Sequence, residues 1–135
     1  MGGCGFVLRD CKRQVLGSAA GKIDQANDAL YTEAVAFLKT IQLLSDWGID
    51  NVEVESDASM LIKDVTCTDL DLSVHGILFK EIRAFSLAKF SSILFSFSPR
   101  ACNEVANAVA MHGLSWCMIP KSCGRDMLQA LPMFL

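Results

Sequence analysis

The sequence predicts a single α/β domain in which a mixed β-sheet is covered by helices. Two short strand patterns open the chain, and alternating helix and strand patterns follow them to about residue 112. A length of 135 residues fits one domain, and a hydrophobic content of 52% is enough to build a buried core. The sequence therefore predicts a globular domain rather than a disordered chain.

The first two elements are predicted to form a β-hairpin. Residues 5–9 and 14–23 are rich in strand-forming side chains, and the segment 10–13 between them has the polar composition of a turn.

The strongest helix pattern runs from Ala29 to Trp47. Apolar residues recur there every three or four positions, Asp28 is a good N-cap, and Gly48 provides the stop. Glu33 falls on the edge of the apolar stripe, so its carboxylate is expected along the surface on which this helix packs.

The second half of the chain alternates strands and helices. Asn51–Ser56 is a predicted strand with Asp57 at its carboxyl end. Further elements are expected as a helix over 58–65, a helix over 73–88, a strand over 92–98 and a last helix capped by Asn103. Residues 116–135 are apolar without a regular pattern, so they are expected to form an irregular tail.

Neither a membrane span nor a disulfide framework is expected. The most apolar stretch, residues 70–97, is interrupted by charges and never reaches the roughly 18 uncharged residues that cross a bilayer. The six cysteines form no C-x-x-C pair and have no histidine at zinc-finger spacing, and no secretory signal precedes them. We therefore expect free thiols and an intracellular protein, in the nucleus or the cytoplasm.

The net charge of −3 argues against general binding of polyanions, since affinity for nucleic acid rests largely on lysine and arginine. A nucleic-acid role therefore needs a local basic patch, for which the leading candidates are Lys12, Arg13 and Arg100. The other candidates are Lys22, Lys80, Arg83 and Lys89. Lysines spread over a solvated helix face are the alternative interpretation.

Glu33 and Asp57 are the candidate site residues. In open α/β sheets ligands bind beyond the carboxyl ends of the parallel strands, where Asp57 is expected and which Glu33 is placed to face. Two carboxylates without a cysteine or histidine nearby suit Mg²⁺ or Mn²⁺, ions that serve phosphoryl transfer. Each acid also has a structural interpretation, Asp57 as a helix N-cap and Glu33 as a partner of the helix dipole.

Four motifs, in order, resemble the plant ribonuclease H type 1 domains of the retroelement-derived kind. Gly2–Asp10 resembles the family's glycine-rich second strand, and Glu33-Ala34 its "AE" first helix. Val52–Asp57 resembles its "V-x-V-E-S-D" strand, and Pro99–Ala110 its closing "P-R-x-x-N-x-x-A-D-x-L-A" motif. The resemblance covers about residues 2 to 115, predicts an incomplete domain over residues 1–115, and leaves the tail outside it.

The resemblance implies a three-layer fold with helices on both faces of the sheet. It also implies an endonuclease that hydrolyses the RNA strand of RNA–DNA hybrids with two divalent metals held by four carboxylates. Glu33 and Asp57 match the second and third acids, and the neutral Asn107 stands at the fourth. The first acid belongs to an Asp-Gly strand expected before Gly2, so the sequence predicts that the central strand of the sheet is missing.

Two functions remain open at this point. One is a ribonuclease H-like domain that binds nucleic acid but is catalytically impaired, because it keeps two of the four matching acids. The other is a non-catalytic remnant that binds nucleic acid or a protein, with an exposed sheet edge or the apolar tail offering a route to oligomers.

Overall fold

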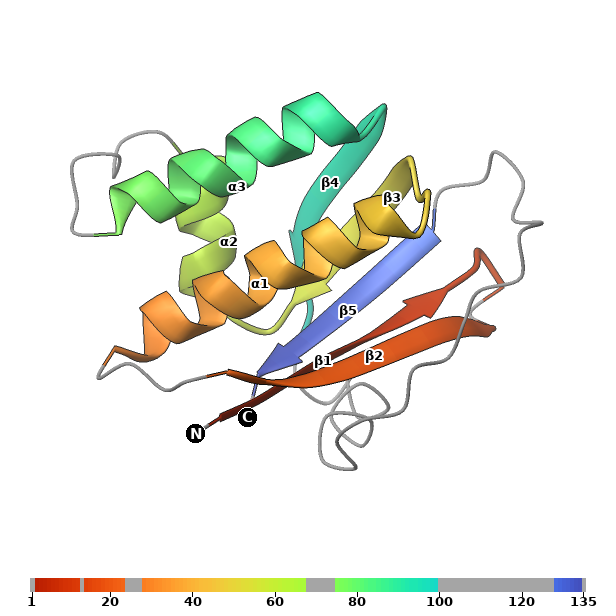
Figure 1. Cartoon of the computed structure of the whole chain (residues 1–135), viewed down its shortest axis with the longest axis horizontal. Helices are drawn as coiled ribbons and strands as arrows, with labels where there is room; N and C mark the ends of the chain where they lie inside the picture. Colours follow the sequence, from red (N-terminus) through yellow and green to blue (C-terminus); the bar gives the residue numbers. More distant parts are fainter. Residues whose placement is uncertain (1, 13, 24–27, 68–74, 100–127, 135) are drawn as a thin grey trace.

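The computed structural model describes residues 2–12, 14–23, 28–67, 75–99 and 128–134, which form a mixed five-stranded sheet and three helices (Figure 1). The strands are β1 Gly2–Arg9, β2 Val15–Ile23, β3 Asn51–Ser56, β4 Ser92–Phe97 and β5 Leu128–Phe134. The helices are α1 Ala29–Asp46, α2 Ser59–Thr66 and α3 Gly76–Lys89. The predicted α/β class is confirmed.

The order of the strands across the sheet is β2-β1-β5-β3-β4. β1 and β2 form the predicted antiparallel hairpin, and β3 and β4 pair in parallel over six residue pairs from Asn51–Ser92 to Ser56–Phe97. These two halves do not pair with one another, because β5 lies between them.

The prediction of an irregular tail is wrong for residues 128–134, which form β5 in the middle of the sheet. β5 pairs antiparallel with β1 from Cys4–Phe134 to Arg9–Gln129, and in parallel with β3 over three pairs, of which Val54–Ala130 is the last. The place for which the sequence predicts a missing strand is therefore filled from the other end of the chain. Among the described strands, the outermost are β2 and β4 rather than the strands beside that place.

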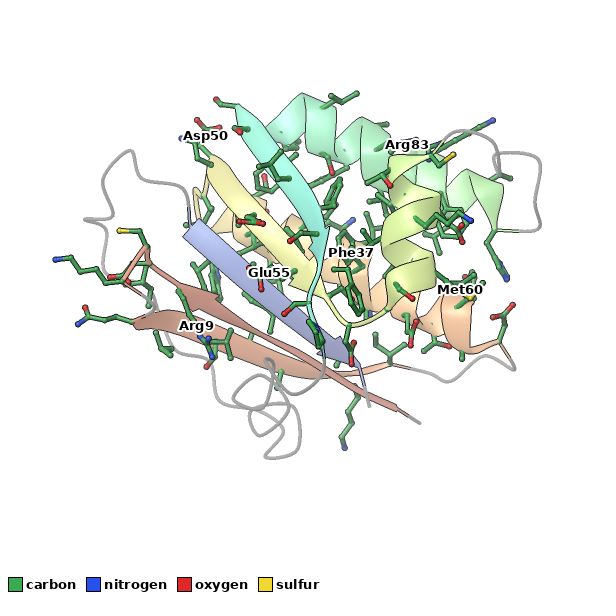
Figure 2. All side chains as sticks on the ribbon, turned by 180° about the vertical axis from the view of Figure 1, so that it is seen from behind. Arg9, Phe37, Asp50, Glu55, Met60 and Arg83 are labelled. Carbon is green, nitrogen blue, oxygen red and sulfur yellow. The ribbon has the colours of Figure 1, made fainter. Side chains whose placement is uncertain are left out.

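The described helices all lie on one face of the sheet (Figures 1 and 2). The apolar stripe of α1 brings Phe37, Ile41 and Leu44 into the core, where they are at most 1% exposed. Phe37 meets Phe95 of β4 with ring centroids 5.3 Å apart, and Ala130 of β5 is fully buried in the same cluster. The expected helix on the other face falls on residues 103–112, which lie outside the described residues.

The ends of α1 follow the predicted signals. Asp28 is the N-cap, and its carboxylate accepts hydrogen bonds from the backbone N–H groups of Leu30 and Tyr31 at 2.9 and 3.3 Å. Gly48 follows the helix with a φ of 77°, a left-handed conformation that glycine adopts without strain. Both ends of α1 are thereby set by local chemistry. Among the described helices, none is long and apolar enough to cross a membrane.

Replacing Ala130 by leucine tests the position of β5. Because Ala130 is fully buried against the helices, the larger side chain should overpack the core and lower the free energy of unfolding by about 1–3 kcal/mol. The matched control is Ala84→Leu, at an exposed position of α3, which should leave stability nearly unchanged. Urea unfolding measures both, and equal stability of the two variants would mean that residue 130 is not in the core.

Candidate active site

The candidate site lies at the end of the sheet that is formed by the carboxyl ends of β3 and β5, not at one of its outer strands. Asp57 follows the last residue of β3, and because β5 runs parallel to β3, its carboxyl end lies at the same end of the sheet. Glu33 reaches this end of the sheet from α1 and is half-buried. The structure thus brings together the two carboxylates that the sequence singles out.

The two acids are close enough for the charge of Asp57 to act on Glu33. Burial raises the pKa of Glu33, and the negative charge of Asp57 raises that pKa further. The two carboxylates repel one another, and Glu33 is partly shielded from water. Packing of the surrounding chain, rather than any attraction between the two groups, therefore keeps them near one another. A cation placed between them would relieve this repulsion.

The structural interpretations of the two acids do not hold. α2 begins at Ser59 with Ala58 as its N-cap and no side-chain cap, so Asp57 does not cap that helix. The hydroxyl of Ser56 instead accepts a hydrogen bond from the backbone N–H of Ala58 at 3.2 Å. Glu33 is the fifth residue of α1, and the first turn of that helix holds no acidic residue. Neither carboxylate is therefore taken up by a cap or by the first turn of a helix.

The strand between β1 and β3 adds no third acid. The sequence of β5 is LQALPMF, which contains no carboxylate. Within the part of the chain that the structure describes, no group of three or more histidine, cysteine, aspartate or glutamate side chains is placed to hold a metal ion. Glu33 and Asp57 would offer carboxylate oxygens, the ligands that Mg²⁺ and Mn²⁺ prefer, to a divalent cation at this end of the sheet.

Lys12, the leading basic candidate that the structure describes, does not lie beside this pair. Lys12 lies in the turn between β1 and β2. Because β1 runs antiparallel to β5 and β5 parallel to β3, that turn is at the opposite end of the sheet from Asp57. Arg13, Arg100 and Asn107 fall outside the described residues.

Arg83 serves a structural role rather than forming part of an exposed basic patch. Its guanidinium donates hydrogen bonds to the backbone carbonyls of Asp64, Val65 and Cys67 at 3.2, 3.5 and 3.4 Å, at the end of α2 (Figure 2). A cation there satisfies carbonyls that have no partner within the helix and complements the helix dipole. This contact joins α3 to α2.

Sequence reasoning missed a polar contact one turn before Glu33. The ring of His75, at the start of α3, hydrogen-bonds through Nε2 to Oδ2 of Asp28, and it lies 5.5 Å from the ring of Tyr31. The hydrogen bond from His75 is the main cause of a lowered pKa for Asp28, and the N–H groups of α1 add to it. Asp28 was recognisable as a cap, but nothing in the spacing indicates a partner 47 residues away.

The comparison with protein families agrees with this geometry. The family described as reverse transcriptase-like matches residues 1–113, most of the chain. The chain belongs to this reverse transcriptase-like family. Its ribonuclease H-like fold, expected from the four motifs, is thereby confirmed.

A solved structure shares the fold of this reverse transcriptase-like domain. The crystal structure of RNase H1 from the halophilic archaeon Halobacterium salinarum NRC-1 superposes with a TM-score of 0.64 at 24% sequence identity. The match covers 82% of this chain and 83% of the archaeal one. No curated protein matches the chain significantly.

Replacing Glu33 by glutamine should stabilise the domain at neutral pH. A carboxyl whose pKa is raised on folding binds its proton more tightly in the folded state, so stability falls as the pH rises through the interval between its ordinary and its raised pKa. Glu33→Gln removes this penalty. The gain at pH 7 should be below about 1 kcal/mol, since solvent screens a half-exposed group.

The gain should vanish below the ordinary pKa of glutamate, and it should shrink in the Asp57→Asn background because part of the penalty comes from that charge. Glu81→Gln, at an exposed position of α3, is the control. Urea unfolding between pH 3 and pH 8 is the measurement. A Glu33→Gln variant that is less stable than the parent at pH 7 would contradict this electrostatic account.

Proposed function

We propose that this chain is a ribonuclease H-like domain that binds RNA–DNA hybrids or related duplexes and cleaves them poorly or not at all. The observation that carries the proposal is the site itself. Glu33 and Asp57 converge at this end of the sheet, while the strand beside them brings no further carboxylate.

The two acids support a role for a divalent cation in binding. Glu33 and Asp57 would hold one Mg²⁺ or Mn²⁺, with water and a phosphate oxygen of the duplex completing the shell. When bound, such an ion supplies positive charge for the phosphate and lowers the pKa of its water. A single ion held by two acids lacks the second ion that steadies the leaving oxygen in two-metal sites, which supports the proposed impairment.

The charge of the domain supports modest affinity. The net charge is −3 and Lys12 lies at the far end of the sheet from Asp57, so neither favours strong binding of phosphates at the site. We expect binding through a small number of phosphate contacts, assisted by the metal. The archaeal protein that shares the fold is named RNase H1, which agrees with a hybrid as the ligand to test first.

The test combines binding and cleavage of a fluorescent RNA–DNA hybrid, in EDTA, in Mg²⁺ and in Mn²⁺. Anisotropy should report binding that strengthens with Mn²⁺. The affinity should fall about tenfold or more between about 50 and 200 mM salt, as expected for at least two phosphate contacts. Gel analysis should show at most trace cleavage.

Asp57→Asn should remove the gain in affinity with Mn²⁺, while Asp46→Asn, at the exposed end of α1, should not. Efficient cleavage that Asp57→Asn abolishes would refute the impairment. The absence of hybrid binding, or binding that salt leaves unchanged, would refute the nucleic-acid function and point to a protein partner.

A further inference from the structure

A cavity of about 130 Å³ opens between α1 and the β1–β2 hairpin, away from the carboxylate pair. Its walls come from β1, β2 and the middle turns of α1, and neither Glu33 nor Asp57 lines it. We call it the hairpin cavity. Its lining residues are Cys4–Phe6, Ala19–Lys22, Ala36, Lys39, Thr40 and Leu43.

The cavity exists because small residues face one another across the contact between helix and hairpin. Ala19 and Gly21 of β2 and Ala36 of α1 carry one side-chain carbon or none, so they do not fill the space between their backbones. A Cβ placed on Gly21 would have the sulfur of Cys4 as its nearest neighbour, at the ordinary contact distance of 3.8 Å. The hydroxyl of Thr40 already donates to the carbonyl of Ala36 at 2.9 Å, which leaves this wall mainly apolar.

Positive charge stands at the mouth of the hairpin cavity. Lys39 of α1 lines it and is exposed, while none of its described lining residues is acidic. Lys22 also borders the cavity, but its side chain points to the opposite face of the sheet from that of Gly21, because neighbouring residues of a strand alternate. The ammonium of Lys39 is close enough to act on the thiol of Cys4. Burial raises the pKa of that thiol, and the charge of Lys39 opposes this effect. The hairpin cavity thus has mainly apolar walls and positive charge at its opening.

The dimensions and the charge together define a class of ligand. A protein cavity of roughly 150 Å³ can hold a benzene ring, so the hairpin cavity has room for one ring or a short alkyl chain. A phosphodiester backbone is a poorer fit, because it is polar along its whole length while these walls are apolar. We propose that the hairpin cavity binds a small amphipathic anion, with its ring or alkyl group inside and its carboxylate beside Lys39.

Benzoate is the probe, titrated into the ¹⁵N-labelled full chain and followed by amide chemical shifts. The shifts should centre on β1, β2 and the middle of α1. Benzamide, which keeps the ring without the charge, should bind more weakly, and so should acetate, which keeps the charge without the ring. This ordering should hold whether or not the chain binds hybrids.

Variants locate the site. Lys39→Gln should weaken benzoate binding about threefold, as expected for an exposed ion pair, while Lys22→Gln, on the other face of the sheet, should leave it unchanged. Lys80→Gln, at an exposed position of α3, is the matched control. Gly21→Val should abolish binding by filling the cavity, and an unchanged pattern of amide shifts elsewhere would show that this variant is folded.

Three results would overturn the proposal. Equal affinity for benzoate and benzamide would remove the role of Lys39, and undiminished binding by a folded Gly21→Val variant would place the ligand elsewhere. Displacement of benzoate by an RNA–DNA hybrid with a higher affinity at this place would make the cavity part of a nucleic-acid surface instead.

Discussion

The rest of the domain depends on a strand filling the position between β1 and β3 in the sheet. Both strands present backbone N–H and C=O groups to it under the cover of α1, and each such group costs about 1–3 kcal/mol when it is buried without a partner. β5 supplies those partners on both sides, antiparallel to β1 and parallel to β3. With this place filled, α1 packs across a continuous sheet, and Glu33 comes to lie opposite Asp57.

A strand in this position can pair with its neighbours without also supplying a metal ligand, and β5 does only the first. Sheet pairing uses the backbone, which residues of almost any type provide, whereas metal binding requires a carboxylate at a defined position. β5 has the apolar sequence LQALPMF, so it completes the sheet without completing the set of acids. Glu33 and Asp57 are then left with their mutual repulsion, which contributes to the raised pKa of Glu33.

The sequence predicted most of the fold because its signals are local. The helix over 29–46, the strand over 51–56 and the carboxylates beside it follow from periodicity, capping and strand ends. β5 could not be predicted in this way, since Pro132 cannot donate to a ladder and a short apolar run fits strand and irregular structure alike. The same limit applies to the contact of His75 with Asp28 and to the position of Lys12, which depend on topology.

The exchange of backbone amide protons with deuterium tests the central claim most directly, because it reports whether β5 has neighbours on both sides. The account predicts that the N–H groups of Gln129 and Ala130, in the part of β5 that pairs with both β1 and β3, are protected nearly as strongly as those of Val52 and Val54. Exchange of the 128–134 segment at the rate of an unstructured chain, with β3 still protected, would contradict it. In that case the place beside the two carboxylates would be open to another strand.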